Sequence, residues 1–318
     1  MTSASCTVVF YHYVREVQGT PFPNIKALAP GDFAAQLDWL QRRTTIIDGE
    51  TFTAWLDGRR AYEAPTALLT FDDGFLDHYA TVFPMLRARG IAGIFFVSGA
   101  TLGPHPELLN VHKTHLLLSV LGSDRFASAV LEEIDEEAAG AAAAVSRDGV
   151  YRYDQAPDVH AKRLLNYELP YAVADYVLDV LCRRHVGEPA ELARQLYLSP
   201  DMIAEMAACG MTFGFHTERH RVLSRLGRAE QEAELRGGVA LIRRLTGQRS
   251  VPFCYPYGFT HTYDSETLAI LAVAGYSMAF NTVREPVRLP VASRFELPRF
   301  DTRDVRRLAE MPTHPIHA

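Results

Sequence analysis

The segment Ala67–Gly74 reads ALLTFDDG and decides the fold that we predict for this chain. Its first five residues, Ala67–Phe71, form an apolar run typical of a buried β-strand, and Asp72, Asp73 and Gly74 follow it directly. In α/β proteins, functional side chains collect where parallel strands end, so two adjacent carboxylates at this point indicate a functional site. The same residues are also typical of a turn that begins a helix, and the segment alone leaves both interpretations open.

Short apolar runs alternate with helical patterns on both sides of this segment, which is typical of βα units and a largely parallel sheet. Further strands are expected at residues 7–13, 91–97, 211–215, 251–255, 276–280 and 295–300. Helices are expected from Pro30 onward, over about residues 77–89 and over about residues 228–246. The predicted fold class is therefore α/β, and about seven units favour a barrel over an open sheet.

The middle of the chain, from about residue 103 to 198, interrupts this alternation. Its pattern is helical, it includes the Ala-rich stretch Glu136–Val145, and no segment of it has a strand pattern. We expect a helical insertion that covers the site, within a single domain that spans residues 1–318.

Several histidines and tyrosines of this insertion are interpreted as structural. His112 and His115 lie in an apolar helical pattern, where histidines more often pack than bind a ligand. Tyr167, Tyr171 and Tyr176 are interpreted as packing residues rather than as a platform for a sugar ring.

Composition narrows the class of protein. The chain has 318 residues, of which 48% are hydrophobic and 22% charged, which is enough for a full buried core. Its formal net charge of −6 offers no basic surface for a phosphate backbone, which argues against nucleic-acid binding. The four cysteines show no disulfide or zinc pattern, no apolar run is long enough to span a membrane, and the first residues do not resemble a signal sequence. A cytoplasmic protein is therefore expected.

Two more polar motifs follow apolar runs in the second half of the chain. The first is HTERH, whose His216 and His220 are four residues apart and can reach one metal ion. The second is Phe253–Gly258, which reads FCYPYG. Each motif alone is also compatible with an ordinary loop. Together with the Asp72-Asp73 pair, they supply an Asp/His/His set of the kind that holds a zinc-like ion with open positions.

The TFDDG, HTERH and YPYG motifs resemble the first three motifs of the polysaccharide deacetylase family, also called the NodB-homology or carbohydrate esterase family 4. The resemblance covers about residues 65–97 and 200–300 and leaves the helical middle unmatched. It implies a deformed (β/α)7-type barrel, a catalytic base at Asp72 and a divalent ion held by Asp73, His216 and His220. It also implies that the backbone N–H of Tyr257 stabilises the oxyanion. Zn²⁺ is the expected ion, with Co²⁺, Ni²⁺ and Mn²⁺ as alternatives.

The chain departs from the usual family pattern at two places, so the cation that pairs with the catalytic aspartate and the general acid are expected elsewhere in the sequence. Cys254 stands where the family usually has an arginine that pairs with the catalytic aspartate, and the late Leu-x-x-His motif that carries the general acid is missing. The segment Phe10–Val14 (FYHYV) resembles a motif of the circularly permuted branch that includes poly-N-acetylglucosamine deacetylases. In that branch the acid histidine precedes TFDDG, so His12 is predicted as general acid; a structural strand-end histidine is the alternative. The LPRFD segment resembles that branch's late motif, and Arg299 is predicted to supply the missing cation, with an ordinary surface arginine as the alternative.

The resemblance implies a metal-dependent hydrolase of amide bonds that removes acetyl from an N-acetylhexosamine in a glycan or glycan precursor. The expected partner is an N-acetylated saccharide, including a membrane-linked glycan met peripherally at the membrane surface. Two alternatives stay open. One is a metal-dependent amide or ester hydrolase that acts on a non-sugar small molecule. The other is a carbohydrate-binding relative without catalysis, against which the complete Asp/Asp/His/His set argues.

Overall fold

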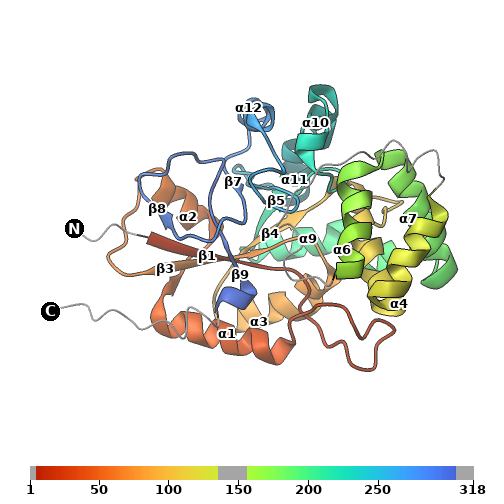
Figure 1. Ribbon diagram of the computed structural model, residues 1–318. Coiled ribbons are helices and arrows are strands. Elements are labelled where there is room, and N and C mark those ends of the chain that lie inside the picture. Colours follow the sequence, from red (N-terminus) through yellow and green to blue (C-terminus); the bar gives the residue numbers. More distant parts are fainter. Residues whose placement is uncertain (1–4, 135–155, 306–318) are drawn as a thin grey trace.

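A curved, largely parallel β-sheet forms the centre of the protein in the computed structural model, which describes residues 5–134 and 156–305 (Figure 1). The strands follow the order β7-β6-β5-β4-β3-β1-β8, with β2 beside β3 and β9 beside β1. Only β8, paired with β1, is antiparallel to its neighbour. The strands are β1 (Ser5–Tyr11), β2 (Thr45–Ile46), β3 (Thr66–Phe71), β4 (Ile94–Val97), β5 (Thr212–Phe215), β6 (Phe253–Cys254), β7 (Ala279–Phe280), β8 (Val287–Arg288) and β9 (Phe300–Asp301).

Helices surround the sheet and form a separate lobe at one end of it. The α-helices are α1 (Pro30–Arg43), α2 (Gly49–Leu56), α3 (Phe83–Ala88), α4 (Asn110–Glu133), α6 (Ala156–Arg163), α7 (Tyr171–His185), α8 (Pro189–Leu196), α9 (Pro200–Ala208), α10 (Arg228–Leu235), α11 (Gly238–Thr246) and α12 (Ser265–Ala274). Two π-helical turns, η1 (His78–Val82) and η3 (Leu164–Glu168), and two 3₁₀ turns, η2 (Gly99–Thr101) and η4 (Leu223–Arg225), complete the described elements. None of the helices in the described ranges is long and apolar enough to cross a membrane.

Both faces of the sheet are buried, which explains why its strands are nearly continuous apolar runs. Alternate residues such as Val9 and Leu69 point to an outer core shared with α1, α3, α9, α11 and α12. Their neighbours Val8 and Leu68 point to an inner core that α2 fills with Trp55. Every residue of β3 is buried, so Asp72 and Asp73 emerge from the centre of the molecule.

The sheet curls because the end of the chain connects its two sides. Leu297 exchanges backbone hydrogen bonds with Ala279 and Asn281 beside β7, and β9 then pairs with β1 in the register Val9 to Phe300. The connection is short, and the result is a deformed half-barrel rather than a regular cylinder. The predicted α/β class with a deformed barrel is confirmed.

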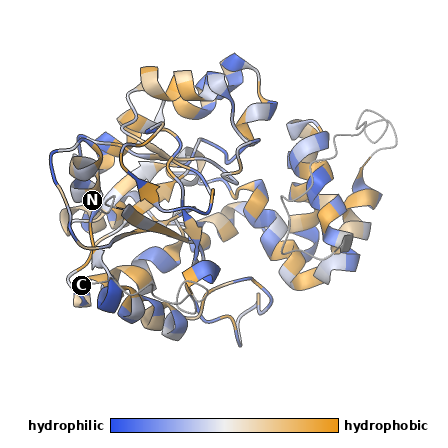
Figure 2. Ribbon diagram, turned by 60° about the vertical axis from the view of Figure 1, so that its left-hand side comes forward, coloured by the Kyte–Doolittle hydropathy of each residue, from blue (hydrophilic) through white to orange (hydrophobic). Residues whose placement is uncertain are grey.

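The range 103–198 contributes α4, α6, α7 and α8 in its described part, and the Ala-rich stretch Glu136–Val145 lies outside the described residues. Three of these helices, α4, α6 and α7, share a core of their own that includes Phe126, Leu165 and Leu178. Figure 2 shows them as a lobe beside the sheet. Tyr167 is buried there, but Tyr176 is 63% exposed, so the packing interpretation is wrong for Tyr176.

Several predicted boundaries differ from those of the structure. The helix predicted over residues 228–246 is wrong as a single element, because it divides into α10 and α11 at Arg236-Gly237. The strands predicted at 251–255 and 276–280 shrink to two residues each, β6 and β7. The helix predicted at 77–89 is present, but begins with the π-helical turn η1.

Candidate active site

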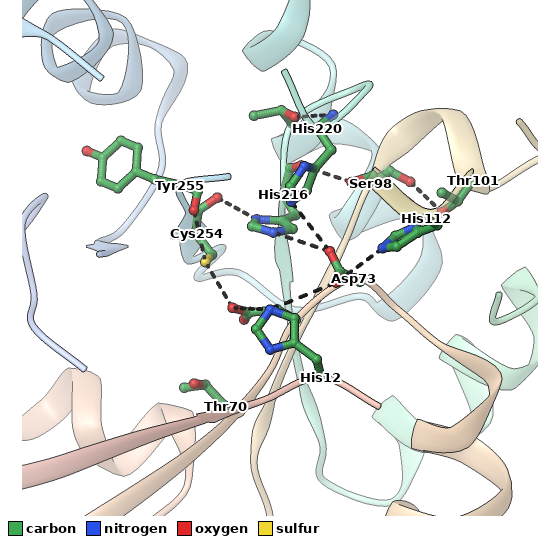
Figure 3. A network of polar contacts seen from close by, with 12 residues as sticks. His12, Thr70, Asp73, Ser98, Thr101, His112, His216, His220, Cys254 and Tyr255 are labelled. Atoms are coloured by element: carbon green, nitrogen blue, oxygen red, sulfur yellow. Dashed lines mark hydrogen bonds and ion pairs between the residues drawn. The ribbon is translucent and has the colours of Figure 1, made fainter. Parts of the chain in front are cut away.

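The predicted site residues meet at the carboxyl edge of the sheet, where Figure 3 shows most of them as sticks. Each comes from the residues that follow a strand, with the exception of Arg299, which precedes β9: His12 follows β1, Asp72 and Asp73 follow β3, His216 and His220 follow β5, and Tyr257 follows β6. All of them, Asp73 included, line one cavity with a volume of about 810 Å³. The helical lobe contributes His115, Lys162 and Asn166 to the same cavity.

Asp73, His216 and His220 form a compact set of metal donors. Oδ1 of Asp73 lies 3.6 Å from Nε2 of each histidine, and the three donor atoms lie within 4.8 Å of one another. The Nδ1 atom of His216 is hydrogen-bonded to the carbonyl oxygen of Cys254 at 2.7 Å, which turns Nε2 toward Asp73. Burial lowers the pKa of His216 and of His220, so both imidazoles are neutral at pH 7, the form that binds metal.

One atom of this set supports a metal directly. Oδ1 of Asp73 is buried and has no hydrogen-bond partner among the described residues. A buried carboxylate oxygen without a donor is costly, and a divalent cation between it and two neutral imidazoles removes that cost. The residues therefore fit a divalent ion with three protein ligands.

Arg299 is fully buried and forms a bidentate ion pair with Asp72. Its Nη1 and Nη2 atoms donate to Oδ1 and Oδ2 of Asp72, each at 2.8 Å. The guanidinium also lies 4.8 Å from the ring centre of Phe10, inside the barrel. Burial alone would raise the pKa of Asp72, but the Arg299 charge and hydrogen bonds hold it below its usual range. The surface-arginine alternative is therefore wrong, and Asp72 stays ionised at neutral pH.

A second set of possible donors, Asp72, His216 and Cys254, is a poor metal site. Nη2 of Arg299 lies 2.9 Å from Sγ of Cys254 and 2.8 Å from Asp72, so a cation already occupies this side. Burial also raises the pKa of the Cys254 thiol, which keeps it protonated. The metal set is thus the one built on Asp73, and Cys254 acts through its backbone carbonyl on His216.

His12 lies beside both carboxylates. Its Nε2 atom is 4.0 Å from Oδ2 of Asp72 and 4.0 Å from Oδ2 of Asp73, and its side chain is 44% exposed. Buried His78 fixes this turn, because its Nε2 atom is hydrogen-bonded to the His12 carbonyl oxygen at 3.0 Å. An imidazole placed between the carboxylates and solvent can transfer a proton, and general acid catalysis by His12 stays a prediction.

Tyr257 lies beside the metal donor His220. Its ring centre is 5.0 Å from that of His220, and its φ of 63° turns the chain after β6 toward the cavity. Its proposed role in stabilising an oxyanion stays a prediction.

The sequence interpretation missed the position of His112. This residue is fully buried, and its Nε2 atom lies 3.3 Å from Oδ2 of Asp73 (Figure 3). His112 belongs to α4 of the insertion, 39 positions along the chain from Asp73. The signal in the sequence was two histidines, His112 and His115, on an apolar helical face, a pattern that most often indicates core packing.

Comparisons with known proteins agree with this geometry. The family model for polysaccharide deacetylase matches residues 59–114 and 170–279, just over half of the chain, and its gap falls within the helical insertion. No curated protein matches the sequence at a significant level.

Solved structures of similar fold cover nearly the whole chain. The deacetylase PplD from Streptococcus pyogenes, solved in complex with acetate, is 16% identical, with a TM-score of 0.59 over 94% of this chain and 93% of its own. IcaB from Ammonifex degensii is 19% identical, with a TM-score of 0.59 over 96% of each chain. A de-N-acetylase from Aggregatibacter actinomycetemcomitans is 13% identical, with a TM-score of 0.56 over 94% and 95%. These likenesses establish the fold, and with the family match they show that this chain belongs to the polysaccharide deacetylase family.

Proposed function

We propose that the protein is a metal-dependent N-deacetylase that removes the acetyl group from an N-acetylhexosamine in a glycan or glycan precursor. The observation that carries the proposal is the pairing of two sites in one cavity. Three buried donors converge at Asp73, and an aspartate held ionised by Arg299 lies directly beside them. Metal-assisted amide hydrolysis needs both a site for a cation and a base, and the cavity offers each from a different residue of the DD pair.

The residues divide the work of the reaction. A divalent ion, when bound, polarises the amide carbonyl and lowers the pKa of the attacking water. Asp73, His216 and His220 would hold that ion, while Asp72 accepts the proton of the water. Asp72 can do this at neutral pH because Arg299 keeps it ionised and fixes the orientation of both its oxygens. His12 then supplies a proton to the departing amine from its position between the carboxylates and solvent.

Two features support a place in the branch with the acid histidine ahead of TFDDG. His12 lies at the end of β1 within the site, and Arg299 reaches Asp72 from the segment before β9. PplD and the de-N-acetylase, whose folds are similar, are named as deacetylases. We infer that the substrate is a saccharide with an N-acetylated amine, such as a nucleotide-linked or lipid-linked precursor. The same proposal places the protein in the cytoplasm, where its four free cysteines suit a reducing environment.

The test is acetate release by the zinc- or cobalt-loaded protein. The substrates are N-acetylglucosamine oligomers, UDP-N-acetylhexosamines and a small acetyl ester, each compared in wild type and Asp72→Asn. We expect release from at least one sugar amide, and a fall in kcat of about 10²–10⁴-fold in Asp72→Asn, because the base is lost. Asp57→Asn, a substitution in a surface ion pair, is the control and should leave kcat unchanged.

Release from the ester alone would favour the non-sugar hydrolase. No release from any substrate by metal-loaded wild type would favour a binding protein without catalysis.

A further inference from the structure

The two oxygens of Asp73 face different partners. Oδ1 lies 3.6 Å from Nε2 of His216 and of His220, on the side of the metal donors. Oδ2 lies 3.3 Å from Nε2 of His112, on the side of the helical lobe (Figure 3). That nitrogen is buried and forms no hydrogen bond with the described residues, so Oδ2 of Asp73 beside it is open to accept its proton. Nε2 of His112 therefore faces Oδ2, the oxygen of Asp73 that lies away from the metal donors.

A hydrogen-bond chain behind His112 fixes which ring nitrogen carries the proton. The backbone N–H of Leu109 donates to the hydroxyl oxygen of Tyr197 at 3.1 Å, and that oxygen lies 2.5 Å from Nδ1 of His112. Burial raises the pKa of Tyr197 well above its usual range, so the hydroxyl keeps its proton. Since the oxygen already accepts from Leu109, its proton is free to go to Nδ1. With Nδ1 accepting from Tyr197, the ring N–H of His112 lies on Nε2, facing Asp73.

The surroundings hold this chain rigidly. The ring of Phe75, two residues after Asp73, lies 4.8 Å from the His112 ring and 6.4 Å from the Tyr197 ring. Lys113, the next residue of α4, forms an ion pair with Asp179 of α7 at 2.7 Å. Both His112 and Tyr197 are buried, with 0% and 4% exposure. Each therefore has little freedom to leave its partner.

We propose that His112 and Tyr197 are positioning residues for the metal centre: Nε2–H of His112 donates to Oδ2 of Asp73, Tyr197 sets the tautomer, and Oδ1 is left for the ion. The inference rests on the metal dependence proposed above. The insertion would then support the metal centre as well as line the cavity, because His112 lies in the first turn of α4 and Tyr197 directly follows α8. The two ends of the insertion thus support one metal ligand.

The test is the affinity for Zn²⁺ and Co²⁺, measured by competition with a chelating dye on the full chain. We expect His112→Ala to weaken metal binding by about 10–100-fold, as is typical when the partner of a metal ligand is removed. His112→Gln should recover most of the affinity, because its side-chain amide can donate from a similar position. Tyr197→Phe should weaken binding less than His112→Ala, because it removes only the hydroxyl that fixes the tautomer of His112. His105→Ala, which removes an exposed histidine ahead of α4, is the matched control and should bind as wild type does.

Each other outcome has a defined meaning. Equal affinity of wild type, His112→Ala and Tyr197→Phe would overturn the positioning role and leave the proposed function intact. A Co²⁺ absorption spectrum that loses a nitrogen ligand in both His112→Ala and His112→Gln would also overturn it, because His112 would then bind the ion itself. Wild type that binds neither ion would refute the proposed metal dependence and this inference with it. Thermal unfolding of the metal-free variants checks their folding, and Tyr197→Phe, which removes a single oxygen, carries the test if His112→Ala does not fold.

Discussion

Backbone strain at single residues coincides with the site. Among the described residues, those with positive φ other than glycine are Asp73 (77°), Thr217 (62°), His220 (55°) and Tyr257 (63°). Three of them are a metal donor or a predicted catalytic residue, and Thr217 directly follows His216. This conformation costs an L-residue roughly 1–2 kcal/mol, so it persists only where the surrounding structure enforces it. The strain turns donors from separate strand ends toward one point.

The pair Arg299–Asp72 yields a prediction for pH dependence. Arg299→Met leaves Asp72 buried and unpaired, which should cost about 3–5 kcal/mol of unfolding free energy at pH 7. The pKa of Asp72 is lowered in the folded protein, so its stabilisation is present above the unfolded pKa of about 3.9 and is lost as pH falls through the folded pKa. The difference from wild type should therefore shrink as pH falls, beginning where Asp72 of the variant takes up its proton and continuing below pH 4. Because the pKa of Asp72 rises in the variant, the acid limb of kcat/KM should move to higher pH.

Urea unfolding at pH 7 and pH 3 and a pH–rate profile check this prediction. Arg294→Met is the control, since it removes a surface pair with Asp57 at 3.1 Å and should cost less than about 1 kcal/mol. An acid limb at the same pH in Arg299→Met and wild type would show that Arg299 does not tune Asp72.

At this scale, the sequence was informative where a residue follows a strand. Asp72, Asp73, His216 and His220 each come after an apolar run, and parallel strand ends necessarily meet at one edge. Arg299 was inferred only through resemblance to a known family. His112 was not predicted as functional, because no local pattern shows which side chain of a helix will meet a distant strand end.

At the scale of elements, stacked charged and aromatic side chains pack the insertion against the HTERH loop. Tyr171, at the start of α7, lies between Arg221 and Arg225, whose guanidinium carbons are 4.1 and 4.5 Å from its ring centre. Arg225 also donates to the carbonyl oxygens of Asn166 and Leu169 near η3. The loop that carries His220 and the lobe that lines the cavity therefore support each other.

Arg225→Ala should loosen this junction. It removes two hydrogen bonds from a charged donor and one cation–π contact, which together correspond to about 2–4 kcal/mol. We expect faster hydrogen exchange in residues 164–171 and 216–226, and a rise in KM that exceeds the fall in kcat, because the cavity wall moves while Asp72 stays paired. Arg228→Ala is the matched control: this arginine is 59% exposed and bonds Glu232 within α10. Unchanged exchange in both segments of Arg225→Ala would contradict a supporting role for the stack.

The break between α10 and α11 shows why element boundaries were harder to predict than elements. The apolar spacing of Leu235, Val239 and Ile242 continues across both helices, so periodicity alone predicts one helix. The pair Gly237-Gly238 has poor helix propensity, and a Cβ at Gly238 would lie 2.2 Å from Phe215 and from Tyr276. Packing against β5 therefore requires glycine at a position where the helical pattern favours another residue.

For the whole molecule, the site depends on contacts between distant parts of the chain. Arg299 and Asp72 are 227 positions apart and are brought together when residues 297–301 connect β7 to β1. Alternating βα patterns predicted the sheet and its buried faces. They did not predict how the sheet curls, because the closing connection is made by only a few residues whose pairing no local pattern specifies.

Because the three metal donors come from distant parts of the chain, we predict that metal binding stabilises the whole fold. His216 and His220 follow β5 and Asp73 follows β3, and an ion bound to all three is lost when the protein unfolds. At a free concentration 100 times the Kd, Zn²⁺ should add about 2.7 kcal/mol to the unfolding free energy. With an unfolding entropy of about 2.1 cal/mol/K per residue, this raises the Tm of the metal-free chain by about 4 °C. Differential scanning calorimetry of the chelator-treated protein, with and without Zn²⁺, measures the shift; Asp57→Asn should retain it and His216→Ala should lose it. An equal rise in His216→Ala would place the ion elsewhere, since the fold would then gain stability from zinc without the donors that meet at Asp73.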